Sequence, residues 1–388
     1  MTVPSVKHFK FDWHLLRPVA DFFPLRQTET STRTCRSGDE DSYLIEVSTS
    51  TTKIFEKQDL LSFSFAQQNS IYNFANLPKS LTSLDVSSTV GTYAHPLLRT
   101  DFEPWKHISR LVNLKSLDVS RVENIQNDWI QYLPRGLTTL KMNFARGITQ
   151  TCDFPRTLTY LSLELASLSD DAIPDLPQGL TYLNLRNSCY LTDDSIAKLP
   201  RSLTYYKNNA PTYTDRCIRH LPSRLRGLDL GEAQKVTTEA LKDLPRELIC
   251  LVLSGIHTTQ IKDLPSGMLH LVLMGRDLVV NDLMSLPTNL TYLGLPHAGI
   301  TDIKNLPAKL LELNISRSQI SEFELECLPD HLNHLDLSLN EVITGEVLSI
   351  LPKSLKSLIL PHNLQPTEAQ RRYLPNTTIL QFPTLGAI

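Results

Sequence analysis

Catalysis or metal binding would require convergent acids, bases and nucleophiles, or a cluster of metal ligands, and the residue spacing predicts neither. The closest pair of the 11 histidines, His331 and His334, is divided between a turn and a strand, which disfavours a shared metal site. The 6 cysteines show no C-x-x-C spacing, which indicates isolated thiols in a reducing compartment. The adjacent carboxylates of Asp193 and Asp194 fit helix capping. We therefore predict a protein that is not an enzyme and binds no metal or cofactor.

Tyrosines are the side chains best suited to binding, because several occupy one position of a recurring phrase, LTYL or a variant of it. These are Tyr160, Tyr182, Tyr205 and Tyr292, and histidines stand there in two other copies, His270 and His334. The first three come from consecutive copies and should stand side by side. Polar residues surround the trio: Lys141, Glu164, Asn184, Arg186 and Lys207.

Two interpretations of the tyrosine row remain open. Tyrosine offers a large rigid surface with a polar tip and is enriched among residues that dominate binding energy. The row can equally be a duplicated consensus whose rings stack across strands for about 0.2–1 kcal/mol per pair. The two interpretations are compatible with each other.

A ten-residue phrase, LPxxLxxLxL, recurs through most of the chain and indicates a repeat architecture. Clear copies include LPKSLTSLDV from Leu77, LPQGLTYLNL from Leu176 and LPKSLKSLIL from Leu351. Its first strand leucine recurs at intervals of 20 to 23 residues between Leu114 and Leu355. With two upstream copies, at Leu60 and Leu81, about 14 strands are expected.

Each repeat contains the signals for one strand and one short helix. The phrase LxxLxL places apolar residues on alternate positions, as a strand with one buried face requires. A second phrase, such as LTDDSIAKLP, supplies a helix cap and inward-facing apolar residues, and its proline ends the helix. The sequence therefore predicts an α/β leucine-rich-repeat solenoid, curved, with a parallel sheet on its concave face and short helices or turns on its convex face.

The ends of a solenoid expose its core, so the flanking segments are predicted to be caps. Residues 1–56 would form an N-terminal cap with a polar loop at about 26–42, residues 57–363 the repeats, and residues 364–388 a C-terminal cap. An asparagine usually completes the turn after each strand, but here only Asn340 and Asn363 occupy that position.

One insertion interrupts the repeat rhythm, at about residues 88–110. Among its side chains are Tyr93, His95, Phe102 and Trp105. Insertions in solenoids often contact partners, whereas an aromatic-rich loop can also fold back onto the core. Both interpretations stay open.

Charge and hydropathy narrow the class of partner. The net charge is −3, with 38 basic and 41 acidic residues, so no positive field is available to attract nucleic acid or an anionic membrane. The N-terminal sequence has no apolar run typical of a signal peptide, and no segment approaches a membrane span. We expect a cytoplasmic protein that binds neither nucleic acid nor membrane.

The repeat phrase resembles that of the leucine-rich-repeat effectors that bacterial pathogens inject into host cells. The phrase LTDDSIAKLP resembles the repeats of F-box-type leucine-rich-repeat substrate receptors. Both likenesses cover about residues 57–380. Some effectors also carry a ubiquitin-ligase nucleophile in a Cys-x-Asp motif, which none of the cysteines here has, and residues 1–56 lack the LPxE opening of an F-box.

The resemblance implies a protein–protein interaction scaffold that binds its partner on the concave face, as a monomer or within a hetero-complex. Two alternatives remain: a substrate-recognition adaptor of a ubiquitin ligase, and an effector delivered into a host cell. A GTPase regulator is disfavoured because its repeats are longer than those found here.

Overall fold

The computed structural model describes residues 62–64, 77, 79–87, 104–122, 125–151, 153–232, 234–255, 263–275, 279–280, 283–300, 303–318, 320–375 and 378–381. The predicted N-terminal cap, residues 1–56, lies outside this part of the chain, as do Tyr93, His95 and Phe102 from the insertion. Trp105 belongs to a described helix, but its side chain is outside the description.

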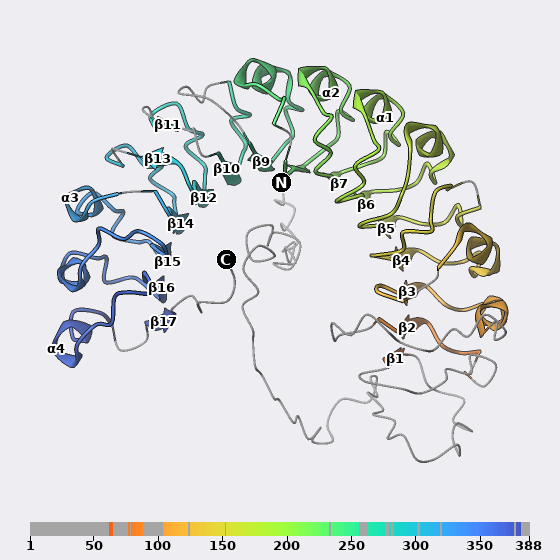
Figure 1. Cartoon of the computed structure of the whole chain (residues 1–388), viewed down its shortest axis with the longest axis horizontal. Helices are drawn as coiled ribbons and strands as arrows, with labels where there is room; N and C mark the ends of the chain where they lie inside the picture. Colours follow the sequence, from red (N-terminus) through yellow and green to blue (C-terminus); the bar gives the residue numbers. More distant parts are fainter. Residues whose placement is uncertain are drawn as a thin grey trace, which may run out of the picture.

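The described strands form one long parallel sheet that lines the inside of an arc (Figure 1). Its order is β1-β2-β3-β4-β5-β6-β7-β8-β9-β10-β12-β14-β15-β16-β17, and every neighbouring pair is parallel. This confirms the predicted curved solenoid. The strands are β1 (Ser62–Ser64), β2 (Ser83–Asp85), β3 (Ser116–Asp118), β4 (Thr139–Lys141), β5 (Tyr160–Ser162), β6 (Tyr182–Asn184), β7 (Tyr205–Lys207), β8 (Gly227–Leu230), β9 (Cys250–Ser254), β10 (His270–Met274), β12 (Tyr292–Gly294), β14 (Glu312–Asn314), β15 (His334–Asp336), β16 (Ser357–Ile359) and β17 (Ile379–Gln381).

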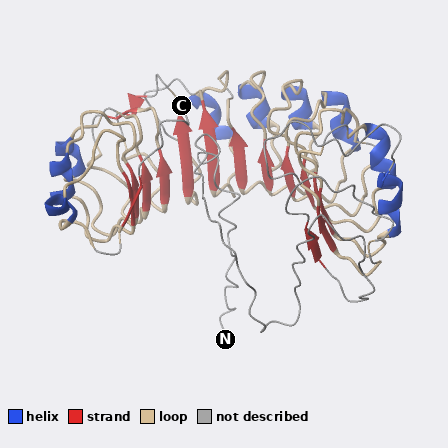
Figure 2. Ribbon diagram, turned by 60° about the horizontal axis from the view of Figure 1, so that its bottom comes forward, coloured by secondary structure: helices blue, strands red, loops and turns tan. Residues whose placement is uncertain are grey.

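Short helices cover the convex side of the arc, and Figure 2 shows them outside the curved sheet. They are η3 (Pro104–Arg110), η4 (Asn127–Tyr132), η5 (Asp170–Asp175), α1 (Asp193–Ala197), α2 (Asp215–Arg219), η6 (Thr238–Asp243), α3 (Glu322–Leu325), η7 (Gly345–Ser349) and α4 (Glu368–Arg371). A second sheet on this side pairs β11 (Val279–Val280) with β13 (Gly299–Ile300). The helices are short because each repeat has only a few residues between its turn and the next Leu-Pro pair.

The core is a ladder of leucines in register across neighbouring strands. Leu84 pairs with Leu117, Leu117 with Leu140 and Leu140 with Leu161, and all four are buried. Tyr206 occupies this position in β7 and is completely buried. Because each strand covers the apolar face of its neighbours, no repeat could bury its leucines alone.

The Leu-Pro pairs form the turns that lead into the strands. The N–H of Leu137 donates to the carbonyl oxygen of Pro134 at 3.1 Å, and equivalent bonds join Leu180 to Pro177 and Leu225 to Pro222. Proline fits the start of such a turn because its φ is fixed and it has no N–H to satisfy. The proline therefore ends one helix and sets the entry angle of the next strand.

The turns that leave the strands satisfy their backbone without the usual asparagine. The N–H of Ala166 donates to the carbonyl of Leu163 at 3.1 Å, and Ser188 bonds in the same way to Leu185 at 3.0 Å. Where Asn340 is present, its side chain also bonds the carbonyl of Ile315 at 2.9 Å in the preceding repeat. Main-chain bonds close the turn, and the asparagine adds a bond between repeats.

In several repeats these turns also place one residue in the left-handed region of backbone space. Leu165 has φ 64°, and its N–H donates to the carbonyl of Arg186 in the next repeat at 2.8 Å. The same conformation recurs at Arg121, Phe144, Asn187, His297, Arg317 and Leu339. Left-handed backbone costs roughly 1–2 kcal/mol for a residue other than glycine, and the lateral hydrogen bonds offset part of that cost.

Strand β17 lies inside the segment predicted to be the C-terminal cap, residues 364–388. Leu380 pairs with Leu358 in the same register as the other strands. The Leu374-Pro375 pair before it is the sequence signal for this additional strand. The described sheet consequently has 15 strands where about 14 were expected.

We predict that Leu228→Ala lowers the free energy of unfolding by about 2–5 kcal/mol, because it leaves a cavity in a packed ladder. Leu228 is fully buried between Tyr206 and Leu251 in register. Urea unfolding followed by circular dichroism measures the change. The control is Val112→Ala, at a side chain that is 65% exposed, and it should cost less than about 0.5 kcal/mol. Equal effects of the two substitutions would contradict the ladder as the source of stability.

Candidate functional site

Tyr160, Tyr182 and Tyr205 form a continuous stack on the concave face of β5, β6 and β7. Their backbones are paired in register. The ring centroids lie 4.1 Å apart between Tyr160 and Tyr182 and 4.8 Å apart between Tyr182 and Tyr205, with interplanar angles of 4° and 2°. The adjacency predicted from the repeat spacing is therefore present, and the stacking follows the spacing between parallel strands.

Gly227 terminates the stack at its β8 end. A Cβ atom on this glycine would lie 2.3 Å from Cδ2 of Tyr205, so the Tyr205 ring rests directly over the glycine. Any side chain at position 227 would push the ring away. Gly227 is not among the residues predicted for the site, although its phrase, LPSRLRGLDL, replaces the tyrosine of LTYL by glycine.

Tyr292 is not part of this stack. Three positions of the row, Gly227, Cys250 and His270, lie between it and Tyr205. The Tyr292 ring instead lies 6.1 Å from the His270 ring at an angle of 35°. The structure thus brings three of the four predicted tyrosines together and leaves the fourth beside a histidine.

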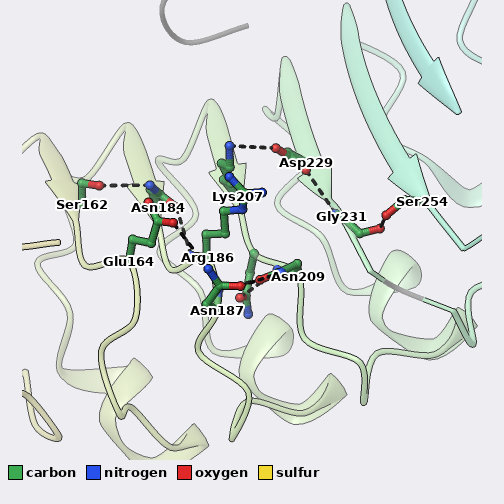
Figure 3. Close-up of polar contacts among 11 residues, drawn as sticks. Ser162, Glu164, Asn184, Arg186, Asn187, Lys207, Asn209, Asp229, Gly231 and Ser254 are labelled. Carbon is green, nitrogen blue, oxygen red and sulfur yellow. Dashed lines mark hydrogen bonds and ion pairs between the residues drawn. The ribbon is translucent and has the colours of Figure 1, made fainter. Parts of the chain in front are cut away.

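A second row of side chains lies on the same face of the sheet, two residues after the tyrosine row in each strand. Next to the tyrosines this second row is polar, and Figure 3 shows it. Nδ2 of Asn184 donates to Oγ of Ser162 at 3.0 Å. Nζ of Lys207 lies 3.2 Å from Oδ2 of Asp229, and these side chains are only 11% and 5% exposed. Lys207 was predicted to lie on the binding face, but its charge is neutralised and buried, so it fixes the strands β7 and β8 to each other.

Lys141 is the accessible cation of this second row. Its Nζ lies 3.5 Å from Oδ2 of Asp118 on β3, and its side chain is 43% exposed. An exposed pair of this kind is only weakly held, which leaves the ammonium group able to exchange its partner.

The predicted residues Glu164 and Arg186 lie in a third row, where the strands turn outwards (Figure 3). The N–H of Arg186 donates to Oδ1 of Asn184 at 3.0 Å. Nδ2 of Asn187 donates to Oε1 of Glu164 at 3.4 Å, and Nδ2 of Asn209 donates to Oδ1 of Asn187 at 2.8 Å. This third row thus carries one acidic and one basic side chain among neutral residues, so it presents polar groups without a strong field of one sign.

Burial raises the pKa of two tyrosines of the stack, Tyr182 and Tyr205. Desolvation raises the pKa of Tyr182 well above its ordinary value, and the neighbouring Tyr160 and Tyr205 raise it further. Desolvation, followed by the charge of Asp229, also raises the pKa of Tyr205. Tyrosine is protonated at physiological pH in any case, and the raised pKa values keep Tyr182 and Tyr205 protonated into the alkaline range.

The paired carboxylates of Asp193 and Asp194 hold structural contacts, and the thiol of Cys250 is buried. Both carboxylate oxygens of Asp193 accept bonds from Thr214, the cap of α2, at 2.8 and 2.5 Å. Asp194 pairs with Arg216 at 3.0 Å. Asp193 therefore ties its repeat to the helix cap of the next one, a role more specific than the predicted capping of its own helix. Burial raises the pKa of the Cys250 thiol to about 12, and so disfavours its reactive thiolate.

Within the described ranges, histidine, cysteine, aspartate and glutamate form no group of three or more that could hold a metal ion. None of the helices in this part of the chain has the length and apolar character that crossing a membrane requires.

A buried polar network that the sequence prediction does not include lies behind the stack. The Tyr206 and Tyr213 hydroxyls are 2.8 Å apart, and Nδ2 of Asn208 donates to the Tyr213 hydroxyl at 2.9 Å. All three residues are completely buried. The signal was the phrase LTYYKNN, in which Tyr206 and Asn208 replace the two inward leucines. A satisfied network of this kind makes the core beneath Tyr205 rigid.

The repeated phrase, the parallel ladder of leucines and the convex helices define a leucine-rich-repeat solenoid. No protein-family model and no curated protein matches the chain.

Several solved structures of leucine-rich-repeat proteins are similar to it. YopM from Yersinia enterocolitica is 24% identical with a TM-score of 0.45, over 84% of this chain and 67% of that one. An internalin from Listeria monocytogenes is 16% identical with a TM-score of 0.41, over 83% of this chain and 80% of the other. The circular leucine-rich-repeat protein CroV588 is 20% identical with a TM-score of 0.40; the match spans 84% of this chain and 43% of that protein.

We predict that Gly227→Ala dislodges the Tyr205 ring and costs about 1–3 kcal/mol of stability, because the added methyl group overlaps the ring. The near-ultraviolet circular dichroism of the stacked tyrosines should weaken at the same time. Gly179→Ala is the matched control, since its nearest contact would be 3.9 Å away. A normal tyrosine signal in Gly227→Ala would contradict the described packing.

We also predict that stability falls as the pH rises above about 10, the ordinary tyrosine pKa that holds in the unfolded chain. Tyr182 and Tyr205 have raised pKa values when folded, so their contribution is complete below that pH and is lost above it. Urea midpoints measured between about pH 8 and pH 11 test this. Replacing Tyr160, Tyr182 and Tyr205 by Phe should make the decline shallower, and an unchanged slope would refute the assignment.

Proposed function

We propose that this protein is a non-enzymatic scaffold that binds a protein partner on its concave face, with Tyr160, Tyr182 and Tyr205 at the centre of the contact. The observation that carries the proposal is the continuous stack of three half-buried rings, fixed in register on adjacent strands. Aromatic anchors in a desolvated setting commonly dominate protein interfaces.

Pre-organisation supports this assignment. Each ring of the stack is held by its neighbour, and Tyr205 is also held over Gly227, so binding would immobilise few additional rotamers. The buried Lys207–Asp229 pair and the polar network of Tyr206 fix the backbone beneath. A rigid aromatic surface therefore loses little conformational entropy on binding, so most of the free energy of its contacts contributes to the affinity.

The surroundings of the stack favour a protein over a nucleic acid. Beside the neutral hydroxyls lie Lys141, Asn184, Arg186 and Glu164, groups of mixed charge that suit the polar rim of a protein interface. A phosphate backbone would require cations along its path, whereas the second row contains Asp118 and Asp229 as well as lysines. Enzymatic chemistry has no comparable support, because the candidate acids are bound to helix caps and arginines.

The test is to purify the partner by affinity, identify it by mass spectrometry and measure its affinity for defined variants. Replacing Tyr160, Tyr182 and Tyr205 together by Ala should weaken binding by roughly 30-fold or more, which corresponds to a hot spot of about 2 kcal/mol. Replacement by Phe should retain most of the affinity, because the ring surfaces remain.

The matched control is Tyr190→Ala, at a tyrosine that is 66% exposed and outside the concave row. It should leave the affinity unchanged. Circular dichroism and urea midpoints establish that each variant is folded. A folded alanine variant with the affinity of the wild type would rule out the stack as the binding site.

A further inference from the structure

Exposure along the second row of the concave face is lowest in the middle of the sheet and rises toward both ends. The residues of this row on β2, β3 and β4, and again on β15, β16 and β17, are half-buried. From β5 to β14 every residue of the row is buried, namely Ser162, Asn184, Lys207, Asp229, Val252, Val272, Gly294 and Asn314. The strands pair in one continuous register, so the position of the row in the sheet does not explain the change.

Val252 on β9 and Ile359 on β16 have similar neighbours in this row but differ in exposure. Each has an aspartate in register on the preceding strand and a cysteine or serine two positions earlier in its own strand. On the following strand Val252 pairs with Val272, and Ile359 pairs with Gln381. Val252 is only 2% exposed, whereas Ile359 is half-buried. The side chains beside Val252 in the sheet therefore do not account for its burial.

No helix or strand of the described ranges lies in front of this part of the sheet. The described helices are on the convex side, and so is the small sheet of β11 and β13 (Figure 1). An apolar patch on the inner face of a solenoid marks a contact surface, and the low exposure of this one indicates that it is covered. The cover has to be sought outside the described ranges.

We propose that residues 8–23 of this chain, HFKFDWHLLRPVADFF, lie across the concave face from β5 to β14 and cover the tyrosine stack and the valines beside it. Apolar residues alternate with polar ones in the first half of this segment, at Phe9, Phe11, Trp13 and Leu15. This alternation is typical of an extended segment with one apolar face. Large aromatic side chains on that face suit a surface of tyrosine rings and valines.

The length of the chain before β1 supports this occupant. Neighbouring strands lie about 4.8 Å apart, so the buried part of the row is roughly 34 Å long. Residues 24–61, when extended, span more than about 100 Å, which is enough to carry the segment to any strand of the sheet. Residues 65–76 and 88–103 are joined to β2 or its neighbours at both ends, so at most roughly 28 Å of either can lie along the row. The chain after β17 leaves beside Gln381, at the half-buried end.

The covered part of the sheet includes β5, β6 and β7, which carry the tyrosine stack. A partner that contacts the stack would have to displace residues 8–23, so the free protein would be held in a state that does not bind. The covering itself does not require the proposed function, whereas this regulatory consequence rests on it.

Three cysteines report on the cover in the full chain. Cys250 lies in the tyrosine row and is 4% exposed, Cys217 belongs to α2 and is fully buried in the core, and Cys189 is exposed. A short treatment with N-ethylmaleimide, followed by mass spectrometry of the peptides, gives the labelling rate of each thiol. In the wild type Cys189 should be labelled while Cys250 and Cys217 are protected, and rapid labelling of Cys250 would overturn the proposal.

The combined variant Phe9→Ser, Phe11→Ser and Trp13→Ser should label Cys250 at least about tenfold faster, because the segment loses the face that holds it on the sheet. Cys217 should stay protected in this variant, which shows that the solenoid is folded. Unchanged protection of Cys250 in the folded variant would contradict the covering.

The matched control changes polar residues of the same segment, in the combined variant His8→Ser, Lys10→Ser and His14→Ser. It should leave Cys250 protected, since the apolar face is intact. Equal labelling of Cys250 in the aromatic and the polar variants would count against a cover held by the aromatic face, and so would overturn the proposal.

A second measurement decides the matter even where the aromatic variant fails to fold. The full chain with p-benzoylphenylalanine in place of Trp13 keeps an aromatic side chain at that position, and irradiation should join it to peptides from β5 to β14 of the same chain. Crosslinks confined to other parts of the chain, or no crosslinks at all, would overturn the proposal. Neither experiment includes a partner, so a negative result leaves the proposed function standing, and a failure of the tyrosine site to bind a partner leaves the covering standing.

Discussion

Everything on the concave face depends on the register of the inward leucine ladder. Strand residues alternate between the two faces, so the pairing that buries Leu161 beside Leu183 also sets Tyr160 beside Tyr182. A slip of one residue would bury the polar face and expose the leucines, which makes the register energetically well defined. The Pro-x-x-Leu turns maintain it, because each starts the strand at the same distance from the previous helix.

The repeats are joined by polar contacts as well as by leucines. Asp170, Asp193 and Asp215 each bind the backbone N–H of a threonine one repeat later, namely Thr192, Thr214 and Thr237. On the opposite edge, Arg135 and Arg156 each donate to a carbonyl of the following repeat. The two edges hold neighbouring repeats at a fixed angle, and so the curvature of the concave face is fixed with them.

The sequence was sufficient for the solenoid and for the adjacency of Tyr160, Tyr182 and Tyr205, because both follow from a constant period and a two-residue alternation. The sequence was not sufficient to predict the tilt of the tyrosine rings. The alternation of strand residues shows which face of the sheet a side chain is on, but not which rotamer it adopts. The tilt depends on Gly227, which leaves room for the Tyr205 ring. Lys207 was placed correctly on the concave row, but its burial with Asp229 depends on a contact between strands. Residues 364–388 are predicted to be a cap because the open end of a solenoid needs covering, and that prediction overlooks the Leu374-Pro375 pair that precedes strand β17.

Departures from the repeat consensus concentrate in two neighbouring repeats. Tyr206 and Asn208 replace inward leucines, Gly227 replaces an aromatic residue, and Lys207 with Asp229 is a buried ion pair. Each of these residues lies under or beside Tyr205. Each lowers the stability of the fold unless its hydrogen-bond or ion-pair partner is in place. Selection for the fold alone would favour apolar residues at positions 206 and 208, as at the equivalent buried positions of the neighbouring repeats, for example Leu183 and Leu185. This cluster of substitutions around Tyr205 therefore indicates a requirement beyond the fold itself, namely a rigid and correctly tilted aromatic surface.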